Sequence, residues 1–143
     1  MRECDGCDSE VESLMHFYVE CQSLKDYHEL LKQCVRKNWE EIKFVDKEWG
    51  RMFLFGMVQE KKVRGNVQLL NMMLSFARYA VRLRRNVAYF EKRKENVWCI
   101  FRTLIKQHIK MIKIYMCEEF CNFFVEGSKF ISVTELNELV FNF

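Results

Sequence analysis

The clearest pattern in the chain is a long amphipathic stretch over residues 66–94. Polar and basic residues occupy one side of a helix drawn at about 100° per residue, and apolar residues occupy the other. The spacing therefore predicts a helix over 66–94 with one buried face. The apolar positions on that face are Leu69, Leu70, Met73, Phe76, Ala77, Ala80, Leu83 and Val87.

A second stretch with the same period predicts a helix over 97–125. Asn96 stands directly before it, at a position where an Asn side chain can cap the first turn. Only Lys94, Glu95 and Asn96 separate the two stretches, so we expect the helices to fold back and pack antiparallel. The apolar positions are Val97, Ile100, Phe101, Leu104, Ile105, Ile109, Ile112, Met116 and Phe120.

The remaining segments are shorter and less regular. A helical period begins at Ser23, a candidate cap, and residues 38–66 indicate a loop-rich connection that can hold a short helix. Residues 129–143 fit either a hairpin or a short helix. Because proline is absent and only 5 glycines occur, the sequence favours long helices. We expect a mainly α fold, a zinc-knuckle-like module over 1–24 and a small helical bundle over 25–143.

Charge is distributed unevenly along the chain. Residues 61–113 hold 14 Lys/Arg against 2 Asp/Glu, a net charge of +12, whereas the flanking segments are acidic. A segment of this charge is typical of contact with an anionic partner. Charged residues also interrupt every apolar run well before the roughly 20 residues of a membrane span, so we expect no membrane partner.

Four residues near the N-terminus have the spacing of a metal site. Cys4, Cys7, His16 and Cys21 read C-x2-C-x8-H-x4-C. Three thiolates and one imidazole suit zinc in a closed tetrahedral site. We therefore predict one structural Zn²⁺ that ties residues 1–24 into a unit. The alternative is that these cysteines are incidental and His16 is an ordinary helix residue.

The other cysteines point to no second site. The chain has 7 cysteines, an odd number, and its acidic N-terminus is not a signal peptide, so a disulfide framework does not fit. We expect reduced thiols in an intracellular protein. Four of them lie at mostly apolar helical positions and are interpreted as ordinary thiols: Cys34, Cys99, Cys117 and Cys121.

The stretch CDGCDSEVESLMHFYVEC resembles the zinc-binding region that follows the polymerase domain in non-LTR (LINE-type) retrotransposon reverse transcriptases. That region has a C-x2-C pair, acidic residues, a hydrophobic–His–hydrophobic segment and a final Cys. These features correspond to Cys4 and Cys7, Glu10 and Glu12, His16 with its apolar neighbours, and Cys21. The segment LLNMMLSFARYAVRLRRN (69–86) is similar in character to the helical C-terminal end of such proteins.

The resemblance implies a role beside the RNA or target DNA of a retroelement, with the rest of a retroelement protein as a further partner. The sequence contains no paired-aspartate polymerase motif and no endonuclease domain, so the resemblance carries over no polymerase activity. A phosphate-binding loop, a dinucleotide fingerprint and a nucleophile–base pair are also missing from the sequence. We therefore expect a non-catalytic C-terminal remnant with no small-molecule substrate.

Two rows of basic residues are the candidate nucleic-acid-binding positions. Their spacing of three and four on neighbouring helices would let them contact phosphates, and Tyr79 and Tyr89 could stack on unpaired bases. Alternatively, the rows are only the solvated surface of a helical bundle that binds a partner protein. The third hypothesis is an enzyme whose activity the sequence does not reveal. The rows are Arg78, Arg82, Arg85 and Lys92, then Arg102, Lys106, Lys110 and Lys113.

Overall fold

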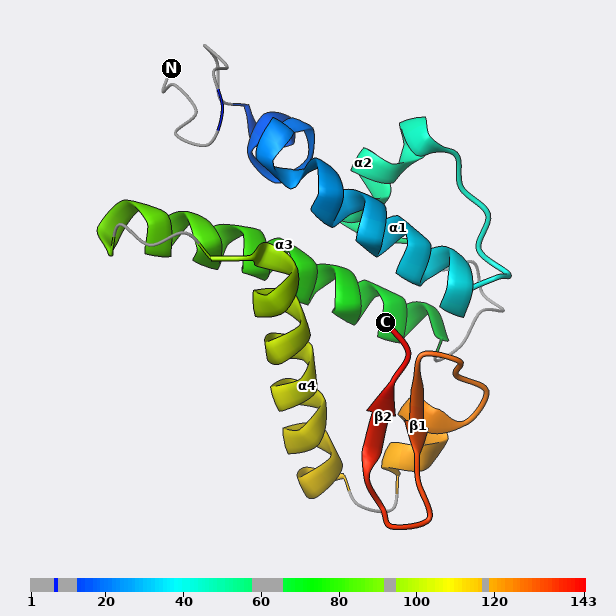
Figure 1. The fold of residues 1–143 in the computed structure, drawn as a ribbon. Helices are drawn as coiled ribbons and strands as arrows, with labels where there is room; N and C mark the ends of the chain where they lie inside the picture. The colour runs from blue at the N-terminus through cyan, green and yellow to red at the C-terminus, as the bar shows by residue number, and fades with distance from the viewer. Residues whose placement is uncertain (1–6, 8–12, 58–65, 92–94, 117–118) are drawn as a thin grey trace.

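The computed structural model describes residues 7, 13–57, 66–91, 95–116 and 119–143. The predicted mainly α class is confirmed, with one small two-stranded sheet at the C-terminal end (Figure 1). In chain order the elements are the π-helical turn η1 (His16–Glu20), the 3₁₀ turn η2 (Gln22–Leu24), α1 (Lys25–Asn38), α2 (Asp46–Phe55), α3 (Asn66–Phe90), α4 (Val97–Tyr115), the π-helical turn η3 (Cys121–Val125), β1 (Ile131–Val133) and β2 (Leu139–Phe141).

Helices α3 and α4 form where the periodicity predicts them, but they do not pack antiparallel. The axes of two antiparallel helices would run side by side. In Figure 1 the axis of α4 instead runs at a steep angle to that of α3. The expected antiparallel arrangement is therefore wrong. Helix α3 ends at Phe90 rather than near 94, so residues 91–96 connect the two helices. Helix α4 ends at Tyr115 rather than near 125, and the buried Phe120 belongs to a separate turn. No helix in the described ranges combines the length and apolar character needed to cross a membrane.

The core includes one broad face of α3, formed by Val67, Leu69, Leu70, Met73, Leu74, Ala77, Ala80 and Val81. Tyr27 of α1 lies where three helices meet. Its hydroxyl donates to the Ala77 carbonyl oxygen of α3 at 2.9 Å. The same tyrosine ring lies edge-on to Trp98 and Phe101 of α4, with centroids 6.3 Å away in both cases. Helices α1 and α4 therefore contact each other directly as well as α3.

The short helix in the loop-rich connection is α2, and it ends at a glycine that the geometry requires. Gly56 has φ +75°, a left-handed conformation that favours glycine. A Cβ there would lie 2.7 Å from Asn71 Oδ1. That oxygen accepts from the Met57 N–H at 2.7 Å, and the Asn71 side-chain amide donates to the Met57 carbonyl at 3.0 Å. Asn71 therefore fixes the end of α2 to α3.

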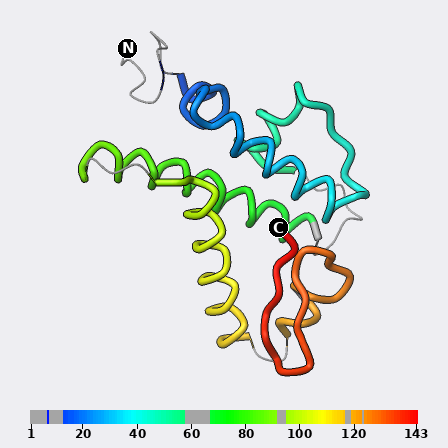
Figure 2. The backbone as a smooth tube through the Cα atoms, in the orientation of Figure 1, coloured from blue at the N-terminus to red at the C-terminus, as the bar shows by residue number. Residues whose placement is uncertain are grey.

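The C-terminal segment adopts the hairpin, the first of its two predicted alternatives. Strands β1 and β2 pair antiparallel, with Ile131 opposite Phe141, and the chain then returns toward the middle of the molecule (Figure 2). The Asn38 amide donates to the Asn142 carbonyl at 2.6 Å, and the Asn142 amide donates to Asn38 Oδ1 at 2.9 Å. This reciprocal pair attaches the hairpin to the end of α1.

Asn96 caps α4 as predicted, with its side-chain oxygen accepting from the Cys99 N–H at 3.2 Å. We expect Asn96→Ala to lower the free energy of unfolding by about 1 kcal/mol, because one amide at the helix start loses its partner. Urea unfolding checks this value. Asn96→Ser, which restores a capping oxygen, serves as the control and should recover most of the loss; equal losses in both variants would show that the cap is not the cause.

Ser23 does not cap α1, contrary to the sequence prediction. The residue before α1 is Leu24, and it makes no side-chain capping bond. The serine hydroxyl instead lies 3.0 Å from Cys21 Sγ. Because η2 inserts a 3₁₀ turn before α1, Ser23 falls inside that turn and faces the cysteine.

Candidate metal centre

The candidate ligands are brought together by the turn η1. Ser13 begins this turn, since its hydroxyl accepts from the His16 N–H at 3.0 Å. At the other end the Cys21 N–H donates to the His16 carbonyl at 3.0 Å, a π-type bond that spans five residues. Such single π turns occur frequently at functional sites. Cys21 then leaves the helical conformation with ψ 128°, so His16 and Cys21 stand at the two ends of one turn.

Three of the four predicted ligands converge. The ligand atoms of Cys7, His16 and Cys21 all lie within 4.8 Å of one another, and Cys7 Sγ is 3.2 Å from His16 Nε2. Zinc bonded at about 2.3 Å to sulfur and 2.0 Å to nitrogen places tetrahedral ligand atoms about 3.5–3.8 Å apart. The three side chains therefore fit three corners of a zinc tetrahedron after shifts of about 1 Å or less. Cys4, the fourth predicted ligand, lies outside the described residues.

The ligands sit at the edge of the protein core. Cys21 is 1% exposed, whereas Cys7 and His16 are half-buried. Helix α2 approaches the turn closely at Gly50, where a Cβ would lie 3.2 Å from Met15 Sδ. The predicted module over residues 1–24 thus contributes Cys21 and Leu24 to the same core as the helices.

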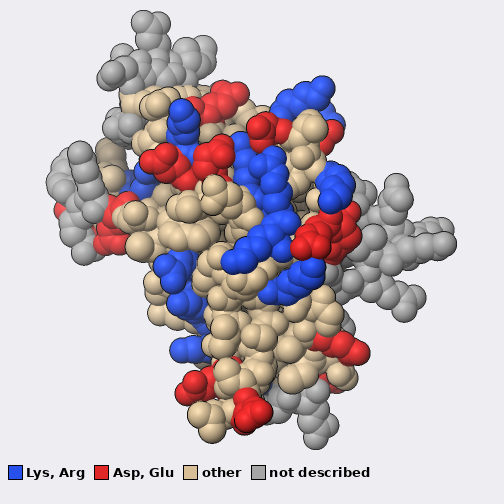
Figure 3. Space-filling model, turned by 45° about the vertical axis from the view of Figure 1, so that its right-hand side comes forward, with Lys and Arg blue, Asp and Glu red and all other residues tan. Residues whose placement is uncertain are grey.

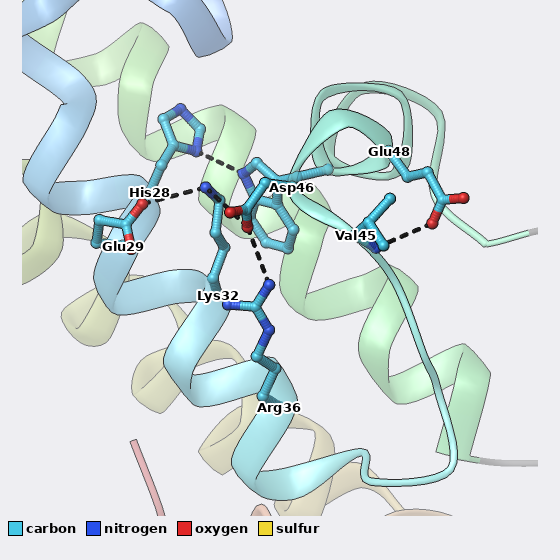
Figure 4. A network of polar contacts seen from close by, with 8 residues as sticks. His28, Glu29, Lys32, Arg36, Val45, Asp46 and Glu48 are labelled. Atoms are coloured by element: carbon cyan, nitrogen blue, oxygen red, sulfur yellow. Dashed lines mark hydrogen bonds and ion pairs between the residues drawn. The ribbon is translucent and has the colours of Figure 1, made fainter.

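His28 is a buried histidine whose role the sequence did not reveal. It is 5% exposed, and its Nε2 donates to the Tyr18 carbonyl at 2.8 Å. Its Nδ1 accepts from Trp49 Nε1 at 3.0 Å (Figure 4). Burial is the main cause that lowers its pKa from 6.5 to about 4. Neutral His28 therefore joins η1, α1 and α2 beside the candidate site. The sequence did contain one indication that His28 is buried. Positions 24, 28 and 31 share one helix face, and Leu24 and Leu31 are apolar.

Ion pairs hold the same helices together on the outside. Asp46 at the start of α2 lies 3.0 Å from Arg36 and 3.6 Å from Lys32, and Lys32 also contacts Glu29 at 3.1 Å (Figure 4). A cavity of about 300 Å³ opens between these side chains and Cys21. Its lining carries both signs of charge, with Glu20, Glu29 and Asp46 beside Lys25 and Lys32.

The first basic row is only partly available to a ligand. Arg78 Nη1 donates to the Phe53 carbonyl at 2.5 Å, and burial lowers the pKa of this guanidinium. The guanidinium of Arg85 lies 4.3 Å from the centre of the Phe17 ring. Arg82 is exposed. Lys92 lies outside the described residues.

The second row shows the same division. Arg102 and Lys106 lie over the Phe143 ring, at 5.2 Å and 5.7 Å from its centre. Lys113 donates to the Asn137 carbonyl in the hairpin turn. Lys110 is exposed. Several side chains that were predicted to contact phosphates thus contact other parts of the chain.

The protein surface has mixed charge on the face shown in Figure 3. Lys and Arg gather in a band through its middle, and Asp and Glu border that band. One exposed ion pair joins residues distant in sequence, since Lys129 Nζ lies 2.9 Å from Glu40 Oε2.

The other thiols that the structure describes do not join the cluster. Cys34 is buried, and burial raises the pKa of its thiol to about 11, which makes it unreactive. Cys99 and Cys121 are exposed, and Cys117 lies outside the described residues. His108 stands on α4 with its ring 4.6 Å from that of Phe76.

Comparison of the chain with protein-family models, with the curated proteins and with the solved structures found no match.

Proposed function

We propose that this chain is a zinc-stapled, non-catalytic module that associates with RNA or DNA, as at the C-terminal end of a LINE-type reverse transcriptase. The convergence of Cys7, His16 and Cys21 is the observation that carries the metal part of the proposal. Cys4 would be the fourth ligand. A zinc ion held by four protein ligands has no open position, so it stabilises the fold and supplies no hydrolytic chemistry.

Nucleic-acid contact is proposed for the exposed part of the basic rows. Arg82 on α3 and Lys110 on α4 are exposed and can neutralise phosphates. On α3, Tyr79 and Tyr89 are 47% and 53% exposed, and exposed aromatic residues can stack on unpaired bases. This combination favours a single-stranded ligand bound without base specificity.

The test is a double charge reversal, Arg82→Glu with Lys110→Glu. We expect weaker binding to all single-stranded sequences alike, because phosphate contacts carry no sequence information. The slope of log K against log salt should fall by about 1.4, since each phosphate contact on a single strand contributes about 0.7. Fluorescence anisotropy with a labelled oligonucleotide over a salt series measures both quantities.

The matched control reverses two exposed basic residues on α2, Lys47→Glu with Arg51→Glu. It changes the net charge equally and should leave the salt slope nearly unchanged. If the control weakens binding as much as the test variant, the contact is not at the proposed rows. If the wild-type chain binds no RNA or DNA at low salt, the nucleic-acid part of the proposal is wrong.

A protein-interaction module is the second candidate, and one surface favours it. Near the end of α4, Met111 is 50% exposed, Ile114 is 65% exposed and Tyr115 is 79% exposed. Apolar side chains gathered in this way are typical of protein contacts. If the oligonucleotide experiment shows no binding, this function replaces the first.

A further inference from the structure

Two consecutive arginines of α3 reach the turn that carries the candidate metal ligands. Arg84 Nη2 donates to the Ser23 hydroxyl oxygen at 2.9 Å, and that oxygen lies 3.0 Å from Cys21 Sγ. Arg85 stacks on Phe17, the residue after His16, with 4.3 Å between the guanidinium carbon and the ring centre. Residues 61 positions apart in sequence therefore meet at one ligand of the site.

The directions of these hydrogen bonds follow from the chemistry of the groups. A guanidinium has donors only, so Arg84 must donate and the Ser23 oxygen must accept. The serine proton then remains available for Cys21 Sγ. A metal-bound cysteine is a thiolate, which accepts hydrogen bonds, so the relay runs from Arg84 through Ser23 to Cys21.

Charge favours the same arrangement. Zinc with three thiolates and one imidazole carries about one negative charge, because Zn²⁺ supplies two positive charges against three negative ones. A guanidinium two hydrogen bonds away stabilises that charge inside the partly buried site. Hydrogen-bond partners of metal ligands typically change metal affinity by about 10–100-fold when they are removed.

We propose that Arg84, acting through the Ser23 hydroxyl, is a positioning residue for the Cys21 thiolate. Metal binding and the seating of α3 against η1 are thereby coupled, so the metal fixes the helix that carries the basic row. This inference rests on the proposed metal centre.

The test compares Arg84→Gln and Ser23→Ala with wild type in the full chain, using Co²⁺ and Zn²⁺ as probes. We expect each variant to bind Zn²⁺ about 10–100-fold more weakly in competition with a chromophoric chelator. The double variant should be no weaker than the weaker single variant, because both changes interrupt one relay. Arg82→Gln is the matched control, since it removes an exposed arginine from the same helix and should leave the affinity unchanged.

A spectroscopic measurement separates the relay from a general loss of stability. Removing a hydrogen bond from a thiolate raises the energy of its lone pairs. The sulfur-to-cobalt charge-transfer band should therefore move to longer wavelength in Arg84→Gln and Ser23→Ala, and not in Arg82→Gln. Ser23→Ala changes one small exposed side chain, so it keeps the test decisive if Arg84→Gln fails to fold.

The outcomes distinguish this inference from the proposed function. If wild type binds neither metal, the metal centre and the relay are both wrong. If wild type binds metal but both Arg84→Gln and Ser23→Ala match Arg82→Gln in affinity and spectrum, the relay alone is overturned. Weaker binding with the band shift in Ser23→Ala supports it.

Discussion

The Cys7→Ser variant is expected to lose its metal and to be far less stable than wild type in the presence of zinc. A serine hydroxyl does not replace a thiolate as a zinc ligand, and metal that binds only the folded state adds its binding free energy to folding. With free zinc about 1,000 times above Kd, wild type gains about 4 kcal/mol. For a chain of this size that corresponds to a fall in Tm of roughly 10 °C in the variant. Elemental analysis and thermal unfolding measure the two effects.

Cys99→Ser is the matched control for this experiment. Cys99 is exposed on α4 and does not belong to the Cys7, His16 and Cys21 cluster, so its replacement should leave one zinc per chain and an unchanged Tm. The metal centre would be disproved if wild type retained no zinc after chelator-free purification. Equal metal content in Cys7→Ser and wild type would place the ion elsewhere.

Local patterns predicted the helices, because each depends on residues close in sequence. The apolar period marked α3 and α4, and Asn96 marked the start of α4 through its own side chain. The angle between the two helices depends on contacts that no local pattern contains. Tyr27 of α1, which bonds to Ala77 and packs on Phe101, comes from another part of the chain. The expectation of antiparallel packing used loop length alone, and it was wrong.

The cluster of candidate metal ligands was predictable for a related reason. Cys7, His16 and Cys21 lie within a short segment, and zinc chemistry restricts their identity and spacing. The arginines were harder to interpret, because periodicity places a side chain on a helix face without showing what covers that face. Arg78 and Arg85 were assigned to phosphates, yet they contact the Phe53 carbonyl and the Phe17 ring. Both contacts join segments distant in sequence.

The sequence gives no indication of what His28 contacts. Its partners are the Tyr18 carbonyl and the Trp49 indole, which reach it from η1 and α2. A backbone carbonyl has no sequence signature, so this hydrogen-bonded junction could be found only in the structure. Its consequence is a dependence of stability on pH.

The fold is expected to lose about 3 kcal/mol of stability as the pH falls from 7 toward 4, through protonation of His28. Its pKa is lowered from 6.5 to about 4, so the unfolded chain takes up a proton that the folded chain refuses. The contribution is therefore complete above pH 6.5 and is lost as the pH falls through the window from 6.5 to about 4. Protonation also ends the Trp49 bond, because Nδ1 then becomes a donor.

The measurement is urea unfolding of wild type and His28→Gln at pH 7.5 and pH 5. Glutamine has one donor and one acceptor for the Tyr18 and Trp49 partners, but it does not titrate in this range. Acid also protonates metal ligands, and that loss is common to both proteins, so the difference between them isolates His28. Wild type should lose about 2 kcal/mol more than His28→Gln between the two pH values. If both proteins show the same pH dependence, His28 is not the group that makes this fold sensitive to acid.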